Sequence, residues 1–135
     1  MQANKTILIV EDDPDDRELL VYAVKNADPV VEVQLAENGQ EAINYLQQQV
    51  TSQAPLPGLI VLDLNMPCLD GKATFQKIKA DHNLHGVPII VFTSSLNPND
   101  KALFNKLGVE LISKPFNFSS MDDIAHHMLD VCSKA

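Results

Sequence analysis

LIVLD, at residues 59–63, is a run of four apolar residues followed directly by an acid. Two similar runs, ILIV at residues 7–10 and IIVF at residues 89–92, are equally short and contain three β-branched residues each. Such runs are too short for helices, and an unbroken apolar run predicts a strand that is covered on both faces. We therefore expect three interior strands of a parallel sheet.

Two further segments predict strands at the edges of that sheet. Residues 31–35 (VEVQL) alternate between apolar and polar, and residues 109–112 (VELI) carry a glutamate. Charged residues within strands are typical of sheet edges, where they discourage pairing with other chains. The segments between the strands show helical patterns. Their expected starts are Asp13-Pro14, Asn38, Asp70-Gly71, Asn97-Pro98 and, for the last helix, Ser119 or Ser120.

The order of the segments predicts an α/β fold. Five strands that alternate with five helices through right-handed crossovers form a doubly wound parallel sheet. With the first, third and fourth strands inside, the order 2-1-3-4-5 of the flavodoxin-like (βα)5 fold is the one that fits. The chain has 135 residues, a size typical of one domain. We expect residues 1–135 to form a single domain without an output domain.

Composition excludes several classes of partner. The formal net charge is -8, which opposes binding to nucleic acid and to anionic membranes. Cys68 and Cys132 are too few for a disulfide framework. No apolar run approaches the length of a membrane span. We expect a cytoplasmic protein.

Polar residues follow the predicted strands where these end. Glu11 and Asp12 come after the first strand, Asp63 after the third, Thr93 closes the fourth, and Lys114 follows the fifth. Ligands of open parallel sheets bind at the carboxyl ends of the strands, around the point where the strand order reverses. We therefore expect these five residues to meet at one edge of the sheet.

The charges at this edge predict a divalent cation. Three close carboxylates repel one another, and one lysine leaves about two negative charges unbalanced. Ligands that are all oxygen, with no histidine or cysteine, favour a hard ion, and Mg²⁺ fits best. A carboxylate beside such an ion can accept a phosphoryl group as an acyl phosphate. The lysine ammonium and the threonine hydroxyl would then supply two more contacts to the phosphoryl oxygens.

Four motifs resemble the receiver domain of two-component response regulators. They are ILIVEDD at 7–13, IVLDLNMPCLDG at 60–71, VPIIVFTSS at 87–95 and LISKPF at 111–116, in the order and spacing of the family. The resemblance extends from Ile7 to the last helix. The opening ILIVEDDPDDREL and the long segment before residue 59 are similar to single-domain regulators that pair with bacterial phytochrome-type kinases.

This resemblance implies a role for each residue. Asp63 would accept the phosphoryl group from a histidine kinase phosphohistidine. Asp12 would bind Mg²⁺ directly, Glu11 would bind it through water, and Asn65 would contribute its backbone carbonyl. The protein would be a signalling switch rather than an enzyme, because it would catalyse only its own phosphorylation and dephosphorylation.

The resemblance also implies how the signal would leave. Thr93 would be the switch hydroxyl, Lys114 would pair with the phosphoryl group, and the Lys114–Pro115 bond would be cis. The surface of the fourth helix, fifth strand and fifth helix would change and contact a downstream protein or a second copy in a homodimer. One residue departs from the family pattern. Leu111 stands three positions before Lys114, where receivers usually have Tyr or Phe, so an aromatic rotamer switch is excluded.

Three other functions compete with this hypothesis. A haloacid-dehalogenase type phosphatase also uses Asp and Mg²⁺, but it needs a second Asp where this chain has Asn65. A flavodoxin-like carrier needs a loop of Ser, Thr and Gly after the first strand to bind phosphate, and EDDPDD presents carboxylates instead. A degenerate receiver that only binds partners is the third alternative, and Leu111 is the residue that favours it.

Overall fold

A five-stranded parallel sheet organises the computed structural model, which describes residues 6–64, 66, 70–94, 97–115 and 118–133. The strand order is β2-β1-β3-β4-β5, which confirms the predicted flavodoxin-like topology and both predicted edges. The elements, in chain order, are β1 (Thr6–Val10), α1 (Pro14–Ala27), β2 (Glu32–Ala36), α2 (Gly39–Thr51), β3 (Leu59–Leu62), α3 (Gly71–Ala80), β4 (Ile89–Thr93), α4 (Pro98–Lys106), β5 (Glu110–Ser113) and α5 (Phe118–Ser133).

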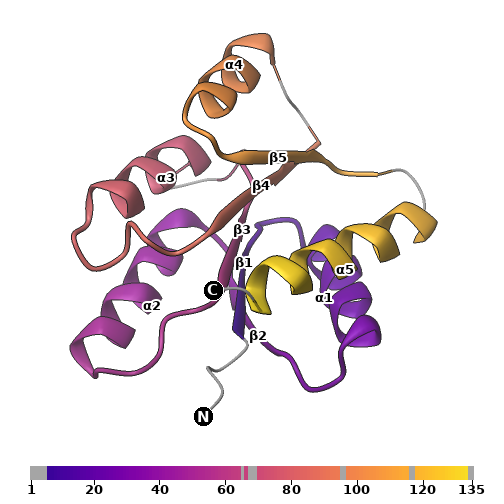
Figure 1. The fold of residues 1–135 in the computed structure, drawn as a ribbon, viewed down its shortest axis with the longest axis horizontal. Helices are drawn as coiled ribbons and strands as arrows, with labels where there is room; N and C mark the ends of the chain where they lie inside the picture. The colour runs from indigo at the N-terminus through magenta and orange to yellow at the C-terminus, as the bar shows by residue number, and fades with distance from the viewer. Residues whose placement is uncertain (1–5, 65, 67–69, 95–96, 116–117, 134–135) are drawn as a thin grey trace.

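Helices cover both faces of the sheet. In Figure 1, α1 and α5 lie side by side on one face, and α2, α3 and α4 lie on the other. Alternate residues of β1 serve the two faces: Ile7 and Ile9 pack in the cluster of α1 and α5, whereas Leu8 and Val10 pack in the cluster that contains α2 and α3. Both faces of β1 are buried from Ile7 to Val10, which is why these four residues are all apolar.

Four of the five predicted helix starts are confirmed. The side chains of Asp13, Asn38, Asp70 and Asn97 each accept a hydrogen bond from a backbone N–H in the first turn of their helix. The fifth was wrong, because α5 begins at Phe118 and its serines lie inside the first turn. The apolar stripe of α5 determines which face is buried, but it does not determine the residue at which the helix begins. The buried residues of that stripe are Met121, Ala125, Met128 and Cys132.

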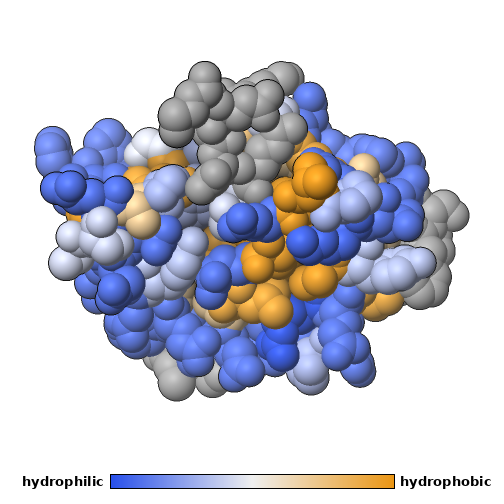
Figure 2. Space-filling model, turned by 90° about the horizontal axis from the view of Figure 1, so that it is seen from below, coloured by the Kyte–Doolittle hydropathy of each residue, from blue (hydrophilic) through white to orange (hydrophobic). Residues whose placement is uncertain are grey.

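The edge strand β2 lies on the side of the molecule that Figure 2 shows. Apolar side chains gather in the middle of this face, with hydrophilic ones around them. Leu35 of β2 is 43% exposed, and Val30, which precedes the strand, is 82% exposed. The exposed Glu32 lies on the same edge strand, where a charge discourages pairing with another chain. Among the described residues, none of the helices has both the length and the apolar character needed to cross a bilayer.

Candidate functional site

Hydrogen bonds of the sheet continue one residue beyond the strands and position the site. The backbone N–H of Glu11 donates to the last carbonyl of β2 at 3.0 Å, and that of Asp63 donates to the last carbonyl of β1 at 3.1 Å. The backbone N–H of Lys114 donates to the last carbonyl of β4, also at 3.0 Å. These three side chains therefore project from the carboxyl edge of a sheet whose geometry is fixed by its backbone ladder.

The predicted acidic residues converge at this edge. Val10 of β1 is in register with Leu62 of β3, so the residues that follow them, Glu11 and Asp63, are neighbours on adjacent strands. Oxygens of Glu11, Asp12 and Asp63 all lie within 4.8 Å of one another. The side chains of Glu11 and Asp63 are 6% and 8% exposed, whereas Asp12 is exposed. The cluster thus has two buried members and one that faces solvent.

Lys114 is the cation of the cluster. Its Nζ lies 2.6 Å from Glu11 Oε1, 2.9 Å from Asp16 Oδ2 and 3.4 Å from Asp63 Oδ2. The sequence predicted that Glu11, Asp63 and Lys114 meet at one edge of the sheet, but it did not single out Asp16. A signal for Asp16 was present, because it lies four residues before the buried Leu20 and therefore on the inward face of α1.

Thr93 and Leu111 lie on one face of the sheet near the cluster. Thr93 is the last residue of β4 and is fully buried. Val91, two residues earlier, is in register with Leu111 of β5, so Thr93 and Leu111 point to the same face. Leu111 is half-buried there against the core cluster of α2, α3 and α4. Leu111, an aliphatic residue, is therefore the diagonal neighbour of Thr93 on the adjacent strand and on the same face.

Burial and charge shift two protonation equilibria in the cluster. Burial, together with the negative charge of Asp63, raises the pKa of Glu11 to about 7, although the hydrogen bond from Lys114 works in the opposite direction. For Lys114, burial lowers the pKa, but the hydrogen bonds to Glu11 and Asp16 and the charge of Asp63 outweigh it and leave the pKa above its ordinary value. Lys114 is therefore charged at neutral pH, and the pKa of Glu11 lies near neutral pH in the absence of a metal.

The donor set fits a hard divalent cation. All of the candidate ligand atoms are carboxylate oxygens, as Mg²⁺ and Mn²⁺ prefer. Three carboxylates beside one ammonium group leave negative charge that a divalent cation would balance. Asn65, whose backbone carbonyl was predicted as a further ligand, lies outside the described residues.

Gly71 allows the chain to close tightly around the phosphoacceptor candidate. Its N–H donates to Leu64 O at 3.0 Å, which draws the start of α3 against the end of β3. A Cβ at position 71 would lie 2.2 Å from Asp63 O and 2.5 Å from Leu64 Cα. Only glycine fits at this position, and it thereby sets how close α3 comes to Asp63.

The expected cis bond between Lys114 and Pro115 was wrong. The structure has no cis peptide bond among its described residues, and both of these residues are described. A trans bond is the ordinary preference before proline. With this trans bond, the backbone N–H of Lys114 still donates its hydrogen bond to Thr93 O of β4.

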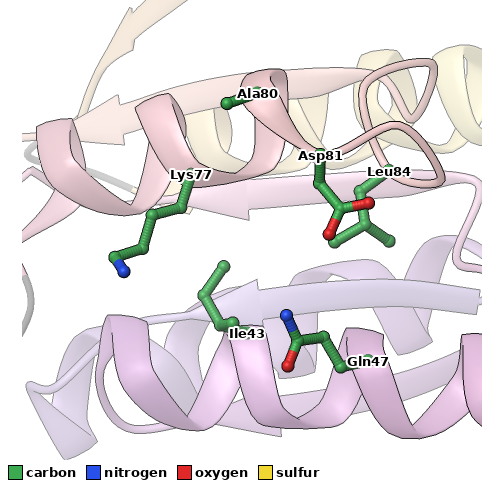
Figure 3. A pocket seen from close by; sticks show the side chains of 6 residues that line it. All are labelled: Ile43, Gln47, Lys77, Ala80, Asp81 and Leu84. Atoms are coloured by element: carbon green, nitrogen blue, oxygen red, sulfur yellow. The ribbon is translucent and has the colours of Figure 1, made fainter.

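Two pockets differ in their relation to the cluster. One, of about 480 Å³, lies beside it and is lined by residues that include Asp12, Met66 and Asn97. At its rim, Lys72 Nζ lies 3.0 Å from Asp100 Oδ1 and joins α3 to α4. The other, of about 300 Å³, lies between α2 and α3, with Gln47 facing it from α2 (Figure 3). This second pocket lies close to the C-terminal end of α3. Because α3 begins at the carboxyl edge of the sheet, its C-terminal end lies away from the edge where such sheets bind ligands.

Comparison with known proteins identifies the family. Residues 7–126 match the response regulator receiver domain. The chain belongs to this family. The match covers most of the receiver, including each strand end that carries a residue of the cluster. It decides against the dehalogenase-type phosphatase and the flavin carrier, because the four motifs occur together in one family match.

Relatives of this receiver include Response regulator Rcp1 of Synechocystis sp., which is 37% identical over 97 residues, or 71% of this chain and 66% of Rcp1. Response regulator GtcR of Aneurinibacillus migulanus is 36% identical over 84% of this chain and 43% of GtcR. The receiver thus spans less than two thirds of each of these two relatives.

Solved structures agree with the fold over nearly the whole receiver. The phosphorylated cyanobacterial phytochrome response regulator RcpA is 34% identical, with a TM-score of 0.85, over 98% of this chain and 97% of RcpA. The Mn²⁺-bound form of Rcp1 is 32% identical, with a TM-score of 0.79, over 91% of this chain and 90% of that one. The first of these proteins was captured with a phosphoryl group and the second with a divalent ion.

Proposed function

We propose that this receiver is a phosphorylation switch whose acceptor is Asp63. The observation that carries the proposal is the arrangement of a buried carboxylate beside two other carboxylates and the ammonium group of Lys114. A degenerate receiver would not need to retain this set of charges. The phosphorylated form of RcpA supports the same chemistry in a protein of similar fold and sequence.

Mg²⁺ would be held by Glu11, Asp12 and Asp63, with Asn65 adding its backbone carbonyl. When bound, it would neutralise negative charge on the phosphoryl group and on the acids around it. The Mn²⁺-bound form of Rcp1 supports a divalent ion in this role.

The reaction would transfer a phosphoryl group from a phosphohistidine of the kinase. An oxygen of Asp63 forms a bond to phosphorus as the nitrogen–phosphorus bond breaks, and the departing imidazole takes a proton from solvent. Lys114 then pairs with one phosphoryl oxygen, and the hydroxyl of Thr93 donates to another. The receiver catalyses this transfer and, later, the hydrolysis of its own acyl phosphate, in which water attacks phosphorus and releases inorganic phosphate and the Asp63 carboxylate, and it turns over no other substrate.

The relatives support a proposal for the partners. A histidine kinase is the phosphoryl donor, and RcpA and AtBRR, both described as phytochrome response regulators, support a kinase of the phytochrome type. Phosphorylation replaces the carboxylate charge of Asp63 with a phosphoryl group that carries about −1.5 to −2. The surface of α4, β5 and α5 changes in response and binds a downstream protein or a second copy of the chain.

Intact mass after incubation with Mg²⁺ and phosphoramidate tests the proposal. The receiver should gain the mass of one phosphoryl group, and the adduct should be labile to base. Asp63→Asn should gain nothing, while Asp15→Asn, which removes an exposed carboxylate of α1, should react like the wild type. An unmodified wild type, or an adduct that persists in Asp63→Asn, would contradict the proposal.

A further inference from the structure

All three donors of the Lys114 ammonium group are matched by acceptors. A lysine ammonium group has three N–H donors. Glu11, Asp16 and Asp63 each place a carboxylate oxygen within 3.4 Å of Nζ. Phosphorylation converts the Asp63 carboxylate into an uncharged acyl group, and the phosphoryl group that it gains, with a charge of about −1.5 to −2, competes with Glu11 and Asp16 for the same ammonium group.

Asp16 is the carboxylate that can leave at the lowest cost. The side chain of Glu11 is 6% exposed, so loss of its cation would leave a buried charge without compensation. The side chain of Asp16 is 38% exposed, and water can solvate it once it leaves Lys114. Asp16 also belongs to the first turn of α1, which faces the edge of the sheet.

We propose that Asp16 is a positioning residue that holds Lys114 before phosphorylation and is displaced from it by the phosphoryl group on Asp63. This inference rests on the proposed function. Before phosphorylation, Asp16 stabilises Lys114 in contact with the two buried acids. After phosphorylation, the ion pair between Asp16 and Lys114 is lost, and the first turn of α1 no longer has a link to the residue that follows β5.

Displacement of Asp16 also provides an output that does not require an aromatic residue at position 111. α1 and α5 pack side by side on one face of the sheet (Figure 1). Leu20 of α1 and Met121 of α5 share one core cluster. A change at the first turn of α1 is therefore adjacent to α5, which belongs to the proposed output surface.

Affinity for beryllofluoride, a phosphoryl mimic, measures the competition between Asp16 and the phosphoryl group for Lys114. With Mg²⁺ present, Asp16→Asn should bind beryllofluoride up to about fivefold more tightly than the matched control Asp15→Asn. The control removes the same charge one residue earlier on the same turn, from a side chain that is exposed. Equal affinity in the two variants, or weaker binding by Asp16→Asn, overturns the inference.

A carboxylate resonance distinguishes displacement from a general structural role. In the wild type, the side-chain ¹³C signal of Asp16, assigned by its absence in Asp16→Asn, should move toward that of Asp15 when beryllofluoride binds. If the Asp16 signal does not move but the wild type still acquires the phosphoryl mass on Asp63, the displacement of Asp16 is refuted and the proposed function stands. If the wild type acquires no phosphoryl mass, the proposed function and this inference both fail.

Discussion

Lys114 and Glu11 form a 2.6 Å ion pair although they follow the fifth and the first strands of the chain. The strands β3 and β4 lie between β1 and β5, so the two side chains extend toward each other over the carboxyl end of β3, where Asp63 lies. Both side chains are at most 10% exposed. The contact therefore exists only when all the strands between them are in place, and it ties the charge balance of the site to the integrity of the sheet.

The raised pKa of Glu11 predicts a pH dependence of stability in the absence of Mg²⁺. The folded state keeps the proton up to a pH of about 7, whereas unfolded glutamate loses it near its ordinary value. The folded state therefore binds more protons between these values, and the free energy of unfolding falls as the pH rises through this window. Urea unfolding with a chelator, at pH 5 and at pH 8, measures the change.

The control for this pH dependence is Glu11→Gln, which cannot titrate at this position. The difference in unfolding free energy between the variant and the wild type should grow in favour of the variant as the pH rises. If the free energy of unfolding depends on pH in the same way in both proteins, the pKa of Glu11 is not raised by folding and the prediction fails.

Mg²⁺ is predicted to stabilise the folded receiver. At ten times its dissociation constant, a ligand that binds only the folded state adds about 1.4 kcal/mol to the free energy of unfolding. Asp12→Asn should lose this gain and change stability little without the ion, because Asp12 is exposed. Asp15→Asn should keep the gain. Equal stabilisation of the wild type and Asp12→Asn in denaturant titrations would place the ion elsewhere.

Gly71→Ala is predicted to disturb both folding and the site. The added Cβ would meet Asp63 O at 2.2 Å, and since the neighbours are backbone atoms, relief requires α3 or the end of β3 to move. We expect a loss of about 1–3 kcal/mol in unfolding free energy and weaker Mg²⁺ binding. Gly86→Ala is the matched control, because a Cβ there meets nothing within 4 Å. Similar unfolding curves for the two variants would contradict the steric argument.

Phe104 is predicted to be a main contributor to the core beneath α4. It is fully buried, and its ring meets that of Phe75 edge to face with centroids 5.2 Å apart. Phe104→Ala should reduce the unfolding free energy by about 3–5 kcal/mol. Leu107→Ala, at a position that is 53% exposed, should cost far less. If chemical denaturation shows that Phe104→Ala and Leu107→Ala lose similar unfolding free energy, the Phe104 side chain is not a main contributor to the packing of α4.

The course of the chain follows closely from local sequence. The uninterrupted runs at 7–10, 59–62 and 89–92 became the three interior strands, because only a strand buried on both faces needs apolar residues at every position. Asp13, Asn38, Asp70 and Asn97 became helix caps because a cap is a contact between neighbours in sequence.

The strand order also made the convergence of Glu11, Asp12 and Asp63 predictable. Parallel strands place their carboxyl ends at one edge, and β1 and β3 are neighbours in this topology. It was enough to know that each of these acidic residues comes just after a strand. Their convergence could be inferred even though Asp63 lies far along the chain from Glu11 and Asp12.

Tertiary structure alone decided which carboxylates share the ammonium group of Lys114. The spacing from Leu20 places Asp16, and not the exposed Asp15 beside it, on the inward face of α1, but only the packed structure shows that Asp16 comes within 2.9 Å of Nζ. The difference arises from the rotation of α1 about its axis, which is set by the packing of Leu20 and Val24 on the sheet. Local patterns determine elements and caps, whereas side-chain partners depend on how the packed elements are oriented.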